Sequence, residues 1–252
     1  MILITGDDSI YSEGLHALRE KLQEKYEILV VATDRDRSTS GHSITLHRPL
    51  RLRQLEKNVH IVDGTPTDCV VLALNELLKA LPEMVISGIN NGKNLGDDIT
   101  YSGTVAAAFE ATLMGIPSLA ISLVVENNEK AFFDTAAYFA NKLAELTFKN
   151  GLPQDTILNV NVPNLPLSGI KGIKITRQGK RVYGDHIMKR KDPRGRPYFW
   201  VGGDMMRVDE SPGTDFRAIE DGFISVTPVR LDLTKYDVFS SLKYLEEINF
   251  GA

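Results

Sequence analysis

Short, unbroken apolar runs recur along the first half of the chain, and each is followed by a segment of different character. The runs lie at residues 2–5, 28–32, 84–87 and 119–122. A short run without alternation is typical of a strand that is covered on both faces. Strands that alternate with helices through short connections predict a parallel sheet with helices on both sides. We therefore expect an α/β fold with a doubly wound, mostly parallel sheet.

Helical signals fill the intervals between these runs. Leucines recur at helical spacing at 15, 18 and 22, after Ser12, a good N-cap residue. Thr65-Pro66 predicts the start of a helix that runs to about Leu81, because proline is tolerated in the first turn. Further helices are expected at about 104–114 and 129–148, and further short strands at 43–52 and 59–62.

The pattern changes near Asn150, where strand-like pieces with turn residues replace the alternation. These pieces lie at 157–162, 172–177, 197–201 and 223–229. We expect one domain over 1–252, with a core at 1–149 and an elaboration at 150–252. The elaboration should contain a basic projecting hairpin at about 177–200 and a terminal helix at about 234–248. Projecting arms of this kind often mediate contacts between subunits.

The overall composition is that of an ordinary water-exposed domain, with 25% charged and 42% hydrophobic residues. A net charge of -4 gives no electrostatic case for binding nucleic acid or a membrane surface. The one cysteine, Cys69, excludes an internal disulfide framework and a multi-cysteine metal site. The N-terminal residues lack signal-peptide features, so we expect a cytoplasmic protein.

Two adjacent carboxylates, Asp7 and Asp8, follow the first predicted strand. Like charges side by side repel, so at least one of them should have a raised pKa unless a cation relieves the pair. The carboxyl ends of parallel strands are where ligands bind in open sheets. Small polar side chains such as Ser38 and Asn90 follow other predicted strands. Oxygen donors of these kinds favour Mg²⁺ or Mn²⁺, so the sequence predicts a divalent-cation site.

Residues 101–104, Tyr-Ser-Gly-Thr, directly precede a predicted helix. The free N–H groups at a helix start suit a phosphate, and a cation site beside it suggests phosphoryl chemistry. Each motif has a plainer interpretation. An acid pair after a strand is more often a solvated turn or cap, and Ser102 or Thr104 is a good N-cap. The shared placement of these motifs at strand ends favours the functional interpretation.

The chain resembles the SurE (survival protein E) family of nucleotidases over nearly its whole length. The resemblance is carried by motifs that occur in order along the sequence. They comprise residues 5–10 with Gly14, 34–38, 41–43, 64–69, 87–96, 101–105, 115–118, 159–163, 176–178 and 225–228. So many ordered matches at compatible spacing are specific.

The resemblance implies a hydrolase that acts on nucleoside 5′- and 3′-monophosphates through metal-assisted attack of water on phosphorus. It implies a Rossmann-like core and one divalent cation per subunit, Mg²⁺ or Mn²⁺. By position in the motifs, the metal ligands would be Asp7, Asp8, Ser38 and Asn90. It also implies a homodimer or homotetramer in which subunits exchange C-terminal segments.

In this hypothesis Asp7 and Asp8 are the catalytic carboxylates. Four residues would position the substrate phosphate: Asn94, Ser102, Gly103 and Thr104. The sequence assigns no general base, and Asp8 or a metal-bound hydroxide are the candidates. No nucleic acid or membrane partner is expected beside the nucleoside monophosphate.

The chain departs from the family pattern at two positions of the first motif and at two prolines elsewhere. The family usually has asparagine at Gly6 and glycine at Ser9, and proline at Thr33 and Lys93. Gly6 lacks an amide that could orient the metal ligands, and such supporting contacts commonly contribute 10–100-fold in affinity or activity. A positive φ at Ser9 would introduce backbone strain. A family member that binds nucleotides with low activity is therefore the main alternative.

Other function classes fit the sequence less well. A dinucleotide-dependent dehydrogenase would need a glycine-rich turn where Asp7 and Asp8 stand. A haloacid-dehalogenase-like phosphatase would need two aspartates separated by one residue. A receiver-like signalling module would need an acceptor aspartate after a later central strand, but residues 84–88 contain none, and the chain is about twice too long.

Overall fold

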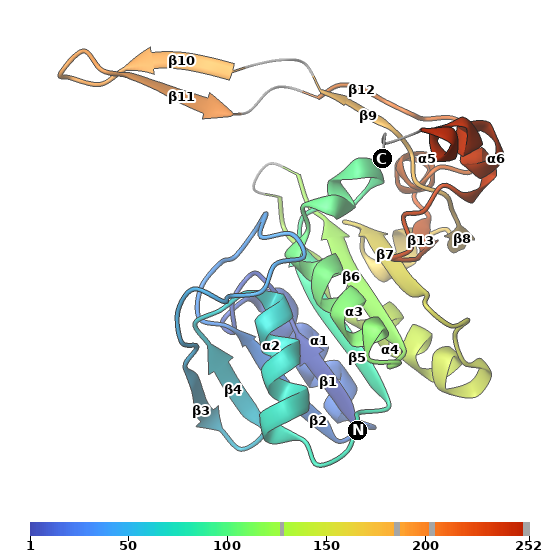
Figure 1. Cartoon of the computed structure of the whole chain (residues 1–252). Helices are drawn as coiled ribbons and strands as arrows, with labels where there is room; N and C mark the ends of the chain where they lie inside the picture. The colour runs from blue at the N-terminus through green and yellow to red at the C-terminus, as the bar shows by residue number, and fades with distance from the viewer. Residues whose placement is uncertain (127–128, 184–186, 202–204, 249–252) are drawn as a thin grey trace.

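The computed structural model describes residues 1–126, 129–183, 187–201 and 205–248. Its centre is a nine-stranded sheet with the order β3-β4-β2-β1-β5-β6-β7-β13-β8 (Figure 1). The strands are β1 (Ile2–Thr5), β2 (Ile28–Thr33), β3 (Leu52–Glu56), β4 (Val59–Val62), β5 (Met84–Asn91), β6 (Ser118–Val124), β7 (Ile157–Pro163), β8 (Ile173–Ile175) and β13 (Ile224–Val229). The pairs β3/β4 and β7/β13 are antiparallel and the remaining pairs are parallel.

Helices cover both faces of this sheet, as the alternation of strand and helix predicts. One face packs against α1 (Glu13–Gln23) and α4 (Phe133–Asn150), and the other against α2 (Pro66–Leu72) and α3 (Gly103–Leu113). In β1, Ile2 and Ile4 belong to the first core and Leu3 to the second. The unbroken apolar run is therefore buried on both sides, and the predicted doubly wound α/β fold is confirmed.

The order of the strands creates a switch point between β1 and β5. From β1 the chain passes to β2 and β4 on one side, and it then returns to form β5 on the other side. The connections that leave the carboxyl ends of β1 and β5 therefore diverge. Open α/β sheets bind ligands in the crevice at such a point.

A glycine allows α1 to pack close to β5. A Cβ atom at Gly14 would lie 2.1 Å from the carbonyl oxygen of Ile89 and 3.0 Å from a ring carbon of Phe133. No side chain fits at that distance, so only glycine is compatible with this position, the second residue of α1. The contact places the start of α1 directly beside the carboxyl end of β5.

Beyond β7 the chain forms α5 (Asp215–Glu220) and an arm that extends from the sheet (Figure 1). The arm has two antiparallel pairs, β9 (Arg181–Tyr183) with β12 (Met205–Val208) and β10 (Ile187–Lys191) with β11 (Pro197–Val201). The predicted hairpin at 177–200 corresponds to this arm, apart from 184–186, which lie outside the described residues.

Three predicted elements differ from the structure. The strand expected at 43–52 is irregular up to Arg51, because Pro49 has no N–H and side chains bind this backbone instead: Asp68 accepts from the N–H of Thr45 and Asp63 from that of Arg51. The helix expected from Thr65 to Leu81 ends in a π-helical turn at Ala73–Leu77.

The terminal helix expected at 234–248 is a series of short turns. They are a 3₁₀ turn at Tyr236–Val238, α6 (Phe239–Leu242) and a second 3₁₀ turn at Lys243–Glu247. Every apolar side chain in this series is at least partly exposed, so no packed face supports a continuous helix. Among the helices of the described residues, none is both long and apolar enough to span a membrane.

Candidate functional site

Asp7 lies at the buried end of β1, against the start of α3. Its side chain accepts a hydrogen bond of 2.5 Å from the hydroxyl of Thr104, and only 3% of the residue is exposed. A Cβ atom at Gly103 would lie 2.9 Å from the Asp7 Oδ2 atom. The absence of a side chain at Gly103 therefore lets the first turn of α3 approach this carboxylate.

Asp8 points toward the end of β5. Its Oδ2 atom accepts a hydrogen bond of 2.6 Å from the backbone N–H of Asn91. Burial raises the pKa of Asp8 to about 6, and the nearby charges of Asp7 and Asp36 add to the effect. Burial also raises the pKa of Asp7, against the hydrogen bond from Thr104. The predicted raised pKa is confirmed, but its main cause is lost hydration rather than repulsion within the pair.

Ser38 lies in the long connection between β2 and β3. Its hydroxyl and its N–H both donate to Oδ1 of Asp36, at 2.5 and 2.7 Å. The backbone N–H of Arg37 donates to the carbonyl of Asp7 at 2.8 Å, and that of Gly41 to the carbonyl of Tyr101 at 2.9 Å. The segment that carries Ser38 is therefore attached at both ends to the residues around the acid pair.

Two hollows adjoin the acid pair. The Asp7 hollow, of about 350 Å³, is lined by Asp7, Ser38, Thr39, Asn90, Asn91, Lys93, Asn94, Asp98, Tyr101, Ser102 and Arg181. The Asp8 hollow, of about 610 Å³, is lined by Asp8, Ser9, Tyr11, Ser12, Glu13, Gly14, Asp36, Ser38, Asn91 and Phe133. Ser38 and Asn91 line both hollows. Of the four predicted metal ligands, Asp7 and Asn90 line the Asp7 hollow, Asp8 lines the Asp8 hollow, and Ser38 lines both.

The four predicted phosphate-binding residues have different surroundings. Asn94 and Ser102 line the Asp7 hollow, and Ser102 caps α3 by accepting from the N–H of Val105. Asn94 is also hydrogen-bonded to the sheet. Its side-chain nitrogen donates to Ser122 on β6, and its backbone carbonyl accepts from Asn159 and Asn161 on β7. Gly103 and Thr104 contact Asp7 but are not among the residues that line the hollow, and Thr104 is fully buried.

The donor set fits a hard divalent cation. It comprises two carboxylates, the Ser38 hydroxyl and the Asn90 amide, whose nitrogen donates to the carbonyl of Gly92 and so leaves the amide oxygen on the other side. Within the described residues no ion pair involves Asp7 or Asp8, and the two cations that line the Asp7 hollow, Lys93 and Arg181, pair with Glu126 and Asp98 instead. The described residues also include no group of three or more His, Cys, Asp and Glu that could hold a metal. The set would rely on neutral oxygen donors.

Sequence reasoning missed three residues of this region. Asn91 binds Asp8 through its backbone, Asn161 orients the loop through Asn94, and Arg181 of β9 lines the Asp7 hollow. Asn91 adjoins a predicted ligand, and its position at a strand end was a usable signal. Arg181 comes from the C-terminal arm, and nothing in the sequence places that arm beside β1. It pairs with Asp98.

Comparisons with known proteins agree on one family. The family profile described as Survival protein SurE matches residues 2–185. A protein of Geotalea uraniireducens named 5′-nucleotidase SurE is 51% identical over 242 residues, which cover 96% of this chain and 97% of that one. A protein of Geobacter sulfurreducens with the same name is 52% identical, covering 96% and 92%. The crystal structure of the SurE protein from Aquifex aeolicus has a TM-score of 0.87 at 44% identity, over 97% and 99% of the two chains.

Ser9 has the positive φ that would introduce strain, +81°. A side chain in this region costs about 1–2 kcal/mol, whereas glycine adopts it freely. We expect Ser9→Gly to raise the free energy of unfolding by about 0.5–1 kcal/mol, after the added unfolded-state entropy of glycine. Urea unfolding measures the change. Ser168→Gly, at an exposed serine without a positive φ, should lower the same quantity; equal effects of both variants would contradict the strain.

The raised pKa of Asp8 predicts a pH-dependent stability in protein stripped of cations. Because the folded-state pKa, about 6, lies above the ordinary value of 3.8, folding favours the protonated carboxyl. The resulting stabilisation is fully present below 3.8 and is lost as the pH rises through 6. Carboxyl carbon-13 titration should give a midpoint near 6 that Asp8→Asn removes. A midpoint near 3.8 would show that the side chain is well hydrated.

Proposed function

The chain belongs to the SurE family, and on that premise we propose that it removes phosphate from nucleoside monophosphates with the help of a divalent cation. It is an enzyme, a phosphoric monoester hydrolase. Its relatives carry the name 5′-nucleotidase SurE. The observation that carries the finer proposal is the acid pair at the switch point of the sheet, in which Asp7 is buried and Asp8 half-buried. The proposal includes 3′-monophosphates, on the resemblance of the motifs.

We assign the cation, one Mg²⁺ or Mn²⁺ per subunit, to Asp7, Asp8, Ser38 and Asn90. When bound, it would neutralise charge on the phosphoryl oxygens and acidify a water molecule. Two observations support the assignment. All four residues offer hard oxygen donors, and each of them lines at least one of the two adjoining hollows. The raised pKa values of both acids indicate a pair that lacks a compensating positive charge.

The Asp7 hollow is the proposed place for the phosphate. In the first turn of α3 the N–H of Val105 donates to Ser102 and the backbone of Thr104 binds Asp7, so we assign the N–H of Gly103 to the phosphate. Asn94 lines the same hollow, as do Lys93, which pairs with Glu126, and Arg181, which pairs with Asp98. Thr104 contributes by holding Asp7, rather than through its hydroxyl on the substrate.

The reaction needs water, an ester and a proton acceptor. A water oxygen bonds to phosphorus while the bond from phosphorus to the ribose oxygen breaks, and that oxygen leaves with a proton. The products are a nucleoside and inorganic phosphate. Asp8, on the boundary with the larger hollow, is the candidate to take the proton of the attacking water.

A nucleotide-binding member of low activity is the second candidate, because Gly6 and Ser9 depart from the family pattern. The space at Gly6 does not itself exclude an asparagine, since a Cβ atom would lie 3.4 Å from the nearest atom, Cδ1 of Leu15. Cation-dependent release of phosphate from AMP by the unaltered chain distinguishes the two candidates, since a binding protein releases none above background.

We further propose a homodimer or homotetramer with exchanged C-terminal segments. The arm and the last turns carry large apolar side chains that are exposed, among them Met188, Phe199, Trp200, Tyr236, Phe239 and Tyr244. Exposed apolar surface of this extent is typical of an interface. We propose the cytoplasm as the compartment, since Cys69 is a free, buried thiol.

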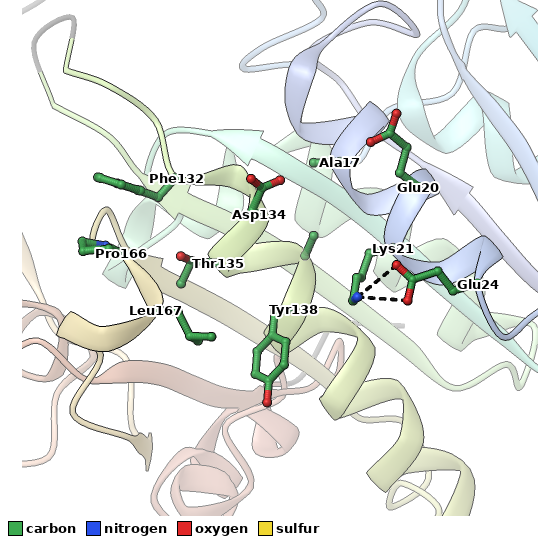
Figure 2. Close-up of a pocket in the computed structure, with 11 residues that line it drawn as sticks. Ala17, Glu20, Lys21, Glu24, Phe132, Asp134, Thr135, Tyr138, Pro166 and Leu167 are labelled. Carbon is green, nitrogen blue, oxygen red and sulfur yellow. Dashed lines mark hydrogen bonds and ion pairs between the residues drawn. The ribbon is translucent and has the colours of Figure 1, made fainter.

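The proposed role of Asp7 is tested by Asp7→Asn. We expect cation-dependent phosphate release from AMP to fall at least 100-fold, because one charged ligand and the partner of Thr104 change together. Phosphate release with Mn²⁺ and Mg²⁺, and Mn²⁺ binding by calorimetry, measure the two effects. Asp134→Asn alters an exposed carboxylate on α4 (Figure 2) and should change neither. Unaltered Mn²⁺ binding in Asp7→Asn would contradict the assignment.

The oligomer proposal is tested by light scattering of the full chain after size exclusion. We expect the mass of two or four chains, and we expect Phe199→Lys with Trp200→Lys to lower it, because both exposed rings lie on β11. Leu46→Lys changes another exposed apolar residue, in the connection before β3, and should leave the mass unchanged. A single-chain mass for the unaltered protein would contradict the proposal.

A further inference from the structure

The two hollows beside the acid pair differ in charge. The Asp7 hollow has two acids, Asp7 and Asp98, and two cations, Lys93 and Arg181. The Asp8 hollow has three acids, Asp8, Glu13 and Asp36, and its lining includes no Lys or Arg. A phosphate therefore meets balanced charge and a helix start on the first side, and only negative charge on the second.

The Asp8 hollow nevertheless has the size and the chemistry of a binding site. Its volume, about 610 Å³, lies within the usual range for small-molecule pockets and exceeds that of the Asp7 hollow. Its wall contains an exposed aromatic ring, Tyr11, which is 64% exposed, and its floor contains the buried ring of Phe133. Carboxylates accept hydrogen bonds, so Glu13 and Asp36 suit a ligand that presents hydroxyl groups.

The backbone beneath Tyr11 is fixed although its ring is exposed. The N–H of Ile10 donates to the carbonyl of Thr33 at 2.9 Å, and the N–H of Ser12 to the carbonyl of Ser9 at 3.2 Å. The N–H of Tyr11 itself donates to the Ser9 hydroxyl at 3.3 Å. An exposed ring on a fixed turn loses little backbone freedom when a ligand stacks on it.

We propose that the Asp8 hollow binds the nucleoside part of the substrate, with the base stacked on Tyr11 and the ribose hydroxyls directed to Glu13 and Asp36. This inference rests on the proposed function, in which the phosphate lies in the Asp7 hollow. Ser38 and Asn91 line both hollows, so one ligand can extend across the boundary past the acid pair. Tyr11 thereby becomes the residue that distinguishes a nucleotide from a simpler phosphate ester.

Two other places for the base are less suitable. Tyr101, which is 61% exposed, lines the Asp7 hollow, but there the base would compete with the phosphate for the smaller volume. A hollow of about 510 Å³ lies between α1 and α4, with Glu20, Asp134 and Tyr138 in its lining (Figure 2). It shares no residue with either hollow at the acid pair, so a base bound there would not be joined to a phosphate beside Asp7.

The test compares AMP with ribose 5-phosphate, which carries the same phosphate ester without a base. We expect Tyr11→Ala to lower kcat/KM for AMP about tenfold, mainly through KM, because removal of an aromatic platform weakens base stacking to this degree. The value for ribose 5-phosphate should change less than twofold. Tyr11→Phe should retain the kinetics of the unaltered chain with both substrates. Inhibition of ribose 5-phosphate hydrolysis by adenosine should weaken by the same factor in Tyr11→Ala.

Tyr101→Ala is the matched variant, with an equally exposed ring on the other side of the acid pair. A loss selective for AMP in Tyr101→Ala and absent from Tyr11→Ala would overturn the inference, as would equal losses for both substrates in Tyr11→Ala. Failure of the proposed function looks different, because the unaltered chain would then release phosphate from neither substrate. Circular dichroism of each variant separates these outcomes from misfolding.

Discussion

The constraint on which the whole region depends is the pair of adjacent carboxylates after β1, with Asp7 buried and Asp8 half-buried. A carboxylate that loses its hydration is costly unless hydrogen bonds or a positive charge replace the water. Here the hydroxyl of Thr104 binds Asp7 and the N–H of Asn91 binds Asp8. These bonds oppose the effect of burial only in part, since both pKa values stay raised. A divalent cation would supply the positive charge that the two carboxylates lack.

The same region also fixes the position of Ser38, although this residue lies in the long connection between β2 and β3. Ser38 lies between two backbone hydrogen bonds, from Arg37 to Asp7 and from Gly41 to Tyr101. Next to them, Nε2 of His42 lies 2.9 Å from a carboxylate oxygen of Glu110, a buried acid on α3. Because α3 also holds Asp7 through Thr104, the helix fixes both the connection and the acid pair relative to one another.

The sequence predicted the core well because its signals are local. Unbroken apolar runs define β1, β2, β5 and β6, and the polar residues that follow them meet because parallel strands end at one edge. Signals that depend on distant packing were missed or misread. Arg181 reaches the site through the arm, and the terminal helix expected at about 234–248 is a series of turns because it has no packed face. The positions of these polar residues after the strands were predictable from the sequence, but their hydrogen-bond partners were not.

The segment after β1 combines strain with close packing, and the combination has a functional consequence. Ser9 holds a positive φ, and Gly14 lies so close to Ile89 that a side chain is excluded. Such a conformation persists only where the surroundings determine it fully, as the bonds of Ile10 and Ser12 to Thr33 and Ser9 do here. Asp8 and Tyr11 are thus carried on one rigid turn. A ligand that contacts both would meet groups whose separation is set before it binds, which lowers the entropy lost on binding.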